Sequence, residues 1–423
     1  MKQRVRQIIN DMRRQPLISG VSFIATVMSV FLFMVVAILQ RLQTIPFAPE
    51  SCRDRLLVGE FFHYKSIDGS GGETSGGMSY ALARQIYGGL DGVESEAFMQ
   101  PDLTTKTVGG QVEKNFQAYC RGVDAGFFKV FDHTLVFGRY FTADEVNAGL
   151  PLIVISERTA RRAFGTTDCA GKSLLLNHRK YTVSGVVKDN SFLATTACGD
   201  VFIATGPDAS ASNDDVYFGN TAAALVVKDG VSFSSIREQV KARYAVLDTE
   251  LKPQGFKSVN HGSPYDQATI ASGLGGSNMT PDNSSQTMYY ILYAILLVVP
   301  ALNLSSLLHS RMHKRISEIG VRRAFGCTRR RVVTDILWEN FLVTLAGGFV
   351  GVTAGIVFAM TYSGLYENID TYGSGLTPAL DSVINWGTVA IAVGVCFILN
   401  LISASVPAWQ ASRLNPVEAI NAK

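Results

Sequence analysis

The stretch that decides the fold is Ile18–Leu39, which reads ISGVSFIATVMSVFLFMVVAIL. It contains no Asp, Glu, Lys or Arg, and about 20 helical residues suffice to cross a hydrocarbon core of roughly 30 Å. The 423-residue chain is 47% hydrophobic and 17% charged, so it is more apolar and less charged than a typical soluble protein. We therefore predict a membrane protein whose first membrane helix covers residues 18–39.

Three further windows without charged residues are also about long enough to span a membrane. They are Ile291–Leu308, Phe341–Met360 and Gly387–Val406. Aromatic residues, which concentrate at membrane–water interfaces, stand at or next to their ends. These are Tyr289, Tyr290, Tyr293, Trp338, Trp386 and Trp409. The sequence thus predicts an α-helical transmembrane domain of four helices.

The distribution of basic residues predicts the topology, because Lys and Arg near helix ends stay preferentially in the cytoplasm. They cluster before the first window and between the second and third, whereas residues 361–385 contain Glu367, Asp370 and Asp381 but no Lys or Arg. Both termini are therefore expected to be cytoplasmic. The predicted segments are cytoplasmic at 1–17, 309–335 and 407–423, transmembrane at 18–39, 289–308, 336–360 and 386–406, and extracytoplasmic at 40–288 and 361–385.

The first window has an alternative interpretation as a cleaved signal peptide, since its basic start resembles that of a secretory signal. The apolar run is too long for this, and Gln40, Arg41 and Leu42 follow it where a cleavage site would need small residues. We expect the segment to be retained as an anchor.

The large segment between the first two windows is long enough for one or two domains with their own cores. Apolar and β-branched runs predict strands at 55–64, 152–155, 172–176, 181–187, 222–227 and 256–260, and helices at 79–87, 157–164 and 232–246. We expect an α+β extracytoplasmic domain with two subdomains. Residues 50–121 and 221–280 would form a membrane-proximal α/β subdomain, and residues 122–220 an inserted β-rich subdomain. Four external cysteines, Cys52, Cys120, Cys169 and Cys198, permit two disulfides or free buried thiols.

No catalytic motif is present. Gly165–Ser173, GTTDCAGKS, nearly matches a phosphate-binding loop, but Thr166 occupies the position of the first glycine, and a predicted helix precedes it where a strand is required. The six histidines are scattered without metal-binding spacing. We therefore predict no enzyme activity, no metal site and no cofactor in this chain. The formal net charge of +3 is too small to indicate a nucleic-acid partner.

The membrane windows contain no ionisable residue, although ion-coupled carriers usually place one near the midplane. The energy for transport is therefore expected to come from elsewhere. In the third window, Gly347, Gly351 and Gly355 recur every four residues and line one helix face, where another backbone can approach closely. The partner helix belongs either to the same chain or to a sister subunit.

The segment between the second and third windows is the most distinctive. Its core, RISEIGVRRAFGCTRRR from Arg315 to Arg331, predicts a helix that ends near Phe325, a left-handed cap at Gly326, and a new basic helix after an N-cap at Thr328. A simpler interpretation is a basic patch that fixes topology or binds anionic lipid headgroups. The chain ends in a second ordered motif, PAWQASRLNPVEAI, at Pro407–Ile420.

Both motifs resemble those of the FtsX/MacB-like permeases of ABC transporters. The resemblance implies a dimer with a second copy or a paralogue, located in the bacterial inner membrane. The cytoplasmic loop would couple to a separate ATPase, which would bind the ATP and Mg²⁺. The coupling residues implied are Arg315, Glu318, Ile319, Gly320, Arg322, Arg323, Gly326 and Arg329. ATP hydrolysis would move the external domain, a process termed mechanotransmission, and drive efflux through a periplasmic adaptor and an outer-membrane channel.

Other roles in the same fold remain open at this point. The chain would then regulate a cell-wall hydrolase, sense an antimicrobial peptide, or release lipoproteins. A membrane-tethered sensor is disfavoured, because only about 17 residues follow the last window and a signalling domain would need more chain than that.

Overall fold

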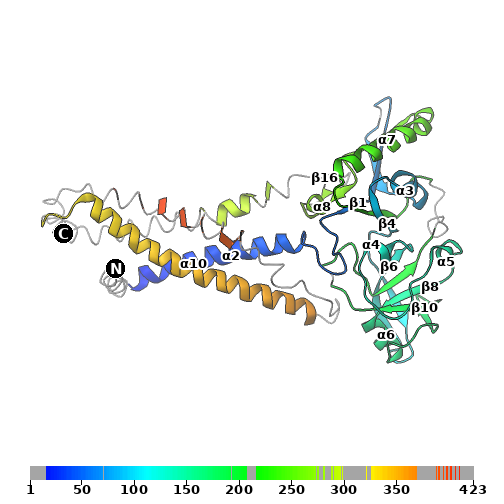
Figure 1. Cartoon of the computed structure of the whole chain (residues 1–423), viewed down its shortest axis with the longest axis horizontal. Helices are drawn as coiled ribbons and strands as arrows, with labels where there is room; N and C mark the ends of the chain where they lie inside the picture. Colours follow the sequence, from blue (N-terminus) through cyan, green and yellow to red (C-terminus); the bar gives the residue numbers. More distant parts are fainter. Residues whose placement is uncertain are drawn as a thin grey trace. The chain divides into compact units, whose positions relative to one another are not determined.

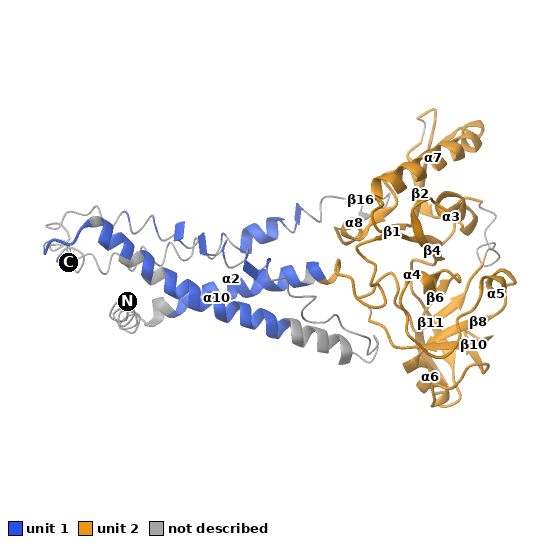
Figure 2. Cartoon of the chain, in the orientation of Figure 1, with its two compact units in different colours: residues 1–41, 286–362, 379–423 blue, residues 42–285, 363–378 orange. Residues whose placement is uncertain are grey.

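The computed structural model describes residues 16–206 and 216–368 apart from short gaps and one long gap at 299–320, and isolated residues from 387 to 409. The chain divides into two compact units (Figure 2). Unit 1 contains residues 1–41, 286–362 and 379–423, and unit 2 contains residues 42–285 and 363–378.

Two long helices dominate the described part of unit 1 (Figure 1): α2, Pro16–Leu42, and α10, Arg329–Asn368. Each contains a stretch long and apolar enough to cross a membrane, Phe23–Leu42 in α2 and Phe341–Phe358 in α10. The first and third predicted windows lie in these helices. The second and fourth windows fall largely outside the described residues.

Helix α10 is longer than the predicted third membrane segment. It begins directly after Thr328, whose backbone carbonyl accepts hydrogen bonds from the amides of Arg331 and Val332, as expected for the start of a helix there. It also continues past residue 360 to Asn368, into the predicted extracytoplasmic loop. The difference arises because a window without charged residues predicts only the part of a helix that lies in hydrocarbon. The helix itself continues into polar residues as long as its backbone hydrogen bonds do.

Unit 2 is built on an eleven-stranded mixed sheet. The strands follow the order β11-β8-β10-β9-β5-β6-β4-β12-β1-β14, and β7 pairs with β10. Their bounds are β1 Leu56–Gly59, β4 Val93–Met99, β5 Thr104–Gly109, β6 Phe116–Val123, β7 Leu135–Gly138, β8 Leu152–Ser156, β9 Ser173–Leu176, β10 Arg179–Val187, β11 Val201–Ala204, β12 Ala222–Val227 and β14 Tyr265–Asp266.

Two smaller sheets and several helices complete unit 2. The sheets have the order β13-β2-β3 and β15-β16. Their strands are β2 Phe61–Ser66, β3 Glu73–Gly77, β13 Phe256–Val259, β15 Leu274–Gly275 and β16 Thr280–Pro281. The helices are α3 Tyr80–Tyr87, α4 Phe127–Val130, α5 Ala143–Asn147, α6 Glu157–Phe164, α7 Phe233–Leu251, the 3₁₀ helix η2 Lys252–Gln254, and α8 Gln267–Ser272.

The first hydrophobic core joins the two ends of the unit. Strands β1 and β12 pair antiparallel, and α3 and α7 pack against strands around them. Every residue of β12 is buried, so its alanines and valines have neighbours on both faces. Residues near 56 and near 225, far apart in the sequence, are thus paired, and burial of their apolar surface stabilises the fold by about 25 cal/mol per Å².

The second hydrophobic core lies around α6 and the strands β8 and β10. These two strands pair in parallel. Val108 in β5 and Phe116 in β6 also belong to it. This core therefore includes residues of β5 and β6, which lie before residue 122, the expected start of the inserted subdomain. The reason is that β5 pairs with both β6 and β9, which brings these strands into the second group.

Local signals explain the helix ends. Ser79 and Ser156 accept amide hydrogen bonds at the starts of α3 and α6, and Gly165 ends α6 in the left-handed conformation with φ of 75°. The stretch Gly165–Ser173 thus follows a helix and leads into β9, so it does not have the strand-to-helix context of a phosphate loop. The strand predicted at 55–64 is instead two strands in different sheets, β1 and β2, which are separated by Glu60.

The cysteines of the described residues are free thiols: Cys52, Cys120, Cys169, Cys198 and Cys327. Cys120, Cys169 and Cys198 are buried. Burial raises the pKa of the Cys120 thiol to about 12, so it stays protonated. Of the two sequence-based alternatives for the external cysteines, the structure has free thiols.

Candidate functional site

The predicted coupling residues lie at the start of α10 and in the segment before it. Gly326 adopts the expected left-handed conformation, with φ of +89°, and Arg329 is the first residue of α10. Arg315, Glu318, Ile319, Gly320, Arg322 and Arg323 lie outside the described residues. We call residues 325–328 the elbow, because the chain turns there before α10 begins.

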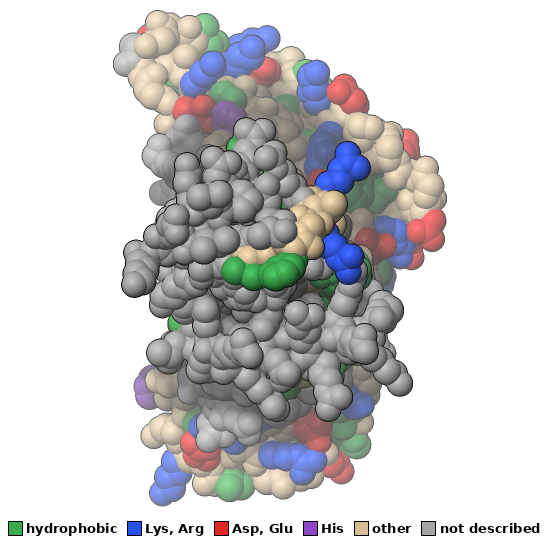
Figure 3. Space-filling view, turned by 90° about the vertical axis from the view of Figure 1, so that its left-hand side faces the viewer, with side chains coloured by type: hydrophobic (Ala, Val, Ile, Leu, Met, Phe, Trp, Pro, Cys, Tyr) green, Lys and Arg blue, Asp and Glu red, His purple; other side chains and the backbone are tan. Residues whose placement is uncertain are grey.

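The elbow presents mixed chemistry to solvent. The Phe325 side chain is 89% exposed, and the side chains of Arg330 and Arg331 just beyond the elbow are exposed too. Figure 3 shows Lys and Arg side chains beside a hydrophobic patch among the described atoms of its central region. The described part of the elbow region thus presents one exposed aromatic ring near two exposed cations.

The three glycines of α10 face α2 of the same chain. A Cβ atom added to Gly351 would lie 2.8 Å from the Val27 carbonyl oxygen, and one added to Gly355 would lie 2.8 Å from the Met34 Cβ. At Gly347 the nearest atom is the Thr26 Cβ at 3.0 Å. The missing side chains therefore let the α10 backbone approach α2, and this close contact is made within one chain.

A second helical segment, residues 290–296, also packs on α2. The Ser29 hydroxyl donates a hydrogen bond of 2.9 Å to the Leu296 carbonyl, and the rings of Phe33 and Tyr293 lie 4.9 Å apart. Helix α2 is thus contacted by the segments that follow and precede the elbow in sequence.

A buried arginine fixes the point where α2 ends. Arg53 Nη1 donates to the carbonyl oxygens of Leu42, the last residue of α2, and Ile45 at 3.0 and 3.1 Å. Its Nη2 donates to the Leu193 carbonyl at 2.5 Å. The Arg53 side chain is fully buried, so these bonds form in an environment of low dielectric constant, where they are strong.

The charge of Arg53 is balanced by Glu50, which is equally buried. The guanidinium Nε donates to Glu50 Oε2, and the other carboxylate oxygen accepts the amides of Thr196 and Ala197, each at 2.8 Å. A buried ion pair is tolerated only when further hydrogen bonds satisfy its remaining atoms. The two amides bound to the Glu50 carboxylate and the Leu193 carbonyl bound to Arg53 all belong to one segment, residues 190–199, which we call the hub loop.

The hub loop is held from its other side by a second buried arginine, Arg121 of β6, which is 1% exposed. Arg121 donates to the hub-loop carbonyls of Thr195 and Cys198 at 2.9 and 3.0 Å. It also donates to the carbonyls of Gln100 and Pro101, which follow β4. The hub loop therefore connects the end of α2 with the strands at the boundary of the two cores.

Sequence reasoning missed the hub loop. Arg53 and Leu193 are 140 positions apart, and Glu50 and Ala197 are 147 apart. The only local signal was Glu50 and Arg53 at i, i+3, a spacing that is far more common on exposed surfaces.

A cavity of about 480 Å³ opens beside the β1–β2 junction. Glu60 and Asp102 both line it. Burial raises the pKa of Glu60 to about 7, and the Asp102 carboxylate raises it too while Arg121 lowers it. A carboxyl group of this kind is partly protonated near neutral pH and can donate a hydrogen bond.

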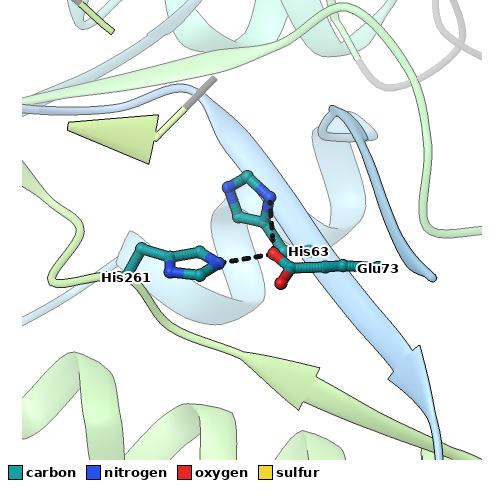
Figure 4. A group of neighbouring side chains, drawn as sticks. All are labelled: His63, Glu73 and His261. Atoms are coloured by element: carbon teal, nitrogen blue, oxygen red, sulfur yellow. Dashed lines mark hydrogen bonds and ion pairs between the residues drawn. The ribbon is translucent and has the colours of Figure 1, made fainter. Parts of the chain in front are cut away.

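Two of the six histidines, which the sequence gave no reason to group, come together in unit 2. His63 in β2, Glu73 in β3 and His261 after β13 lie side by side (Figure 4). Glu73 Oε1 contacts His261 Nε2 and lies 3.5 Å from His63 Nδ1. Burial lowers the pKa of His63, and the nearby His261 lowers it further while Glu73 raises it. His309 and His313 lie outside the described residues.

Two family models match the chain in sequence order. Residues 17–243 match the MacB-like periplasmic core domain, and residues 290–416 match the FtsX-like permease C-terminal domain. The second match covers the motif at Arg315–Arg331 and residues 407–416 of the closing motif.

Curated relatives are similar over most of this chain. The macrolide export ATP-binding/permease protein MacB of Bdellovibrio bacteriovorus is 24% identical over 330 residues, which is 75% of this chain and 47% of that protein. The uncharacterized ABC transporter permease YknZ of Bacillus subtilis is 23% identical over 337 residues, 78% of this chain and 77% of that one. The chain thus spans about half the length of the MacB relative.

Solved structures that match cover the external part. One is the periplasmic region of MacB from Actinobacillus actinomycetemcomitans, with 17% identity and a TM-score of 0.34 over 49% of this chain and 88% of that one. Another is the extracellular domain of YknZ from Gram-positive bacteria, with 18% identity and a TM-score of 0.33 over 48% of this chain and all of that one.

Proposed function

Since the chain belongs to the family of ABC transporter permeases that combine a MacB-like periplasmic core domain with an FtsX-like C-terminal domain, we propose that it is the membrane subunit of an ABC exporter. A separate ATPase subunit binds the cytoplasmic side and supplies ATP hydrolysis. The chain crosses the membrane four times, places both termini in the cytoplasm, and moves substrate collected outside the membrane.

The observation that carries this proposal is the order of the two family matches around the external domain. The first match runs from α2 into unit 2, and the second covers the elbow and α10. A chain of this kind links a cytoplasmic surface to an external domain through membrane helices. That connection is what an exporter driven by a separate ATPase needs.

The contacts of α2 provide a route for the movement. The elbow leads into α10, α10 packs on α2 through its glycines, and the end of α2 is bonded to Arg53. Arg53 and Glu50 hold the hub loop, which Arg121 links to β6. A shift of α10 that moves α2 along its axis therefore pulls on groups with directional hydrogen bonds, and the external domain follows.

The test uses two glutamate–arginine pairs with the same i, i+4 spacing. Glu318→Ala with Arg322→Ala removes the pair in the proposed coupling loop. Glu157→Ala with Arg161→Ala removes a matched ion pair in α6 of the external unit. The full chain is purified from its native membrane, and an associated ABC ATPase is identified by mass spectrometry and by ATP hydrolysis.

The ATPase is expected to co-purify with the wild-type chain and with the α6 variant, but not with the loop variant. Retention by the loop variant would move the coupling surface elsewhere. Failure to recover an ATPase with the wild-type chain would overturn the proposal. Crosslinking in the native membrane then separates export from regulation, because an exporter captures an adaptor or channel, whereas a regulator captures a cell-wall hydrolase.

A further inference from the structure

The cluster of His63, Glu73 and His261 has the composition of a metal site. His63 Nδ1, His261 Nε2 and a Glu73 carboxylate oxygen all lie within 4.8 Å of one another (Figure 4). Two imidazole nitrogens and one carboxylate oxygen form a ligand set that binds Zn²⁺ and related transition metals in proteins.

The register of strands β2, β3 and β13 brings these three side chains together. Strands β2 and β3 pair antiparallel with Lys65 opposite Glu73 and His63 opposite Ser75. His63 and Glu73 are therefore diagonal neighbours on one face of the hairpin, where side chains are within reach of each other. Strand β13 pairs with the other edge of β2, with Val259 opposite His63, and His261 follows two residues later. Three separate segments thus supply one ligand each.

The buried Nδ1 atom of His63 lacks a hydrogen-bond partner among the described residues. His63 is 2% exposed, and its Nδ1 atom has no hydrogen bond among the described residues. The 3.5 Å to Glu73 Oε1 is longer than a hydrogen bond. A buried polar atom without a partner costs free energy, so an additional group that accepts its lone pair is favoured there.

The spacing suits a tetrahedral ion. Metal–nitrogen and metal–oxygen bonds of about 2.0–2.1 Å place neighbouring ligand atoms about 3.3 Å apart. The separation between His63 Nδ1 and Glu73 Oε1 is already close to this value. His261 lies nearer to Glu73, and its side chain is 30% exposed, so it has room to move back by the required fraction of an ångström.

We propose that His63, Glu73 and His261 bind a divalent transition-metal ion such as Zn²⁺, with a fourth position open to water or to a ligand from outside. The ion ties the segment after β13 to the β2–β3 hairpin. That segment continues into β14 and α8 of the same unit, so the ion restrains the start of this stretch.

The experiment measures metal binding by the full chain in detergent, produced without a polyhistidine tag and stripped with a chelator. Zn²⁺ is added by equilibrium dialysis and counted by elemental mass spectrometry, and Co²⁺ is used as a spectroscopic probe of tetrahedral nitrogen and oxygen ligands. The variants are Glu73→Gln, which preserves side-chain shape, and His261→Ala, which changes a partly exposed residue. His178→Asn, at an exposed turn, is the matched control.

We expect one Zn²⁺ per wild-type chain and per His178→Asn chain. The two cluster variants are expected to bind more than about 100-fold more weakly, since even loss of an outer-shell partner costs 10–100-fold. Zn²⁺ should raise the unfolding temperature of the wild-type chain but not that of His261→Ala. Absence of saturable binding by the wild-type chain, or equal binding by the cluster variants, would overturn the site and leave a hydrogen bond between Glu73 and His261 as the cluster's whole role.

Discussion

The flank and the end of α2 are held by opposite kinds of chemistry. Along its flank, α2 meets the glycines of α10 through backbone and aliphatic atoms, as at Gly351 and Val27. At its end, the Leu42 carbonyl is bound by a fully buried arginine that is paired with a buried glutamate. Close packing of small residues is short-ranged and has little directional preference, whereas charge-assisted hydrogen bonds are directional.

This difference predicts that α2 can slide against α10 along its flank, whereas its end pulls on the groups bonded to Arg53. Two helices in contact through glycines can shift by small steps at modest cost, because the packing contacts at these glycines have little directional preference. The Arg53 attachment cannot shift without leaving buried charges unsatisfied. Movement of α2 is therefore transmitted through Arg53 to the hub loop, while the contact between α2 and α10 accommodates small shifts. The predictions below test that division in order of decreasing effect.

The largest effect is expected for Arg53→Met. The substitution leaves the Glu50 carboxylate buried without its cation, and breaking a buried pair in this way costs about 3–5 kcal/mol. The hub loop should open more often, so Cys198, which is 2% exposed, should react faster with a thiol reagent. Partly exposed Cys52 and Cys327 serve as internal references for the labelling rate.

Arg161→Met is the control for this prediction. Its ion pair with Glu157 lies in α6, and the Arg161 side chain is 63% exposed. Exposed pairs contribute about 0–1 kcal/mol, so the reactivity of Cys198 should stay near that of the wild-type chain. Equal labelling in the two variants would mean that the end of α2 is held no more firmly than a surface pair.

Glu60→Gln is expected to have the next largest effect, because Glu60 is a half-buried carboxyl that forms no ion pair among the described residues, unlike Glu50. Its pKa is raised from an ordinary value near 4.5 to about 7. The folded state therefore holds the proton more tightly, and the resulting stabilisation is complete below pH about 4.5 and is lost as pH rises to about 7. The loss is at most about 3 kcal/mol at 1.36 kcal/mol per pKa unit.

The measurement is the unfolding of both proteins in detergent between pH 5 and 8. The stability of Glu60→Gln relative to the wild-type chain should rise across this range. Asp124, whose pKa burial also raises to about 7, titrates in both proteins, so the difference between them is the informative quantity. A difference that does not change with pH would show that Glu60 is ionised in the folded chain throughout.

Gly351→Ala tests the flank. The new methyl group would lie 2.8 Å from the Val27 carbonyl oxygen, which belongs to the backbone and cannot rotate away. The helices must separate, and overpacking of this kind costs about 1–3 kcal/mol. Chemical unfolding of the full chain in detergent measures the loss. An unchanged or higher stability would show that α2 and α10 are not in contact at this position.

The elements that sequence reasoning located are those set by local properties. The apolar length of Ile18–Leu39 and Phe341–Met360 located α2 and α10, and the apolar runs at 79–87 and 157–164 located α3 and α6. The left-handed turn at Gly326 was predictable because only glycine adopts that conformation without strain.

The parts that sequence reasoning missed depend on distant pairing. Glu73 and His261 are 188 positions apart, and neither occurs in a metal-binding spacing. Whether the glycine face of α10 meets its own chain or a sister subunit also has no sequence signal, because either partner needs the same small residues. Strand β5 pairs with both β6 and β9, and this places β5 and β6 in the second core, which the hydrophobic pattern alone does not specify.

The smallest effect is expected for Gly347→Ala, where two terms oppose each other. The new methyl group would lie 3.0 Å from the Thr26 Cβ, so α2 must move by a few tenths of an ångström. Replacing glycine by alanine inside a helix contributes about 0.5–1 kcal/mol in the opposite direction. The net change in stability should lie within about 0.5 kcal/mol. Gly20→Ala in α2 is the control, since a Cβ there meets nothing within 4 Å, and it should show the full helical gain. If Gly347→Ala lost as much stability as Arg53→Met, the flank would be as rigid as the end of α2, and the difference between the two contacts would not hold.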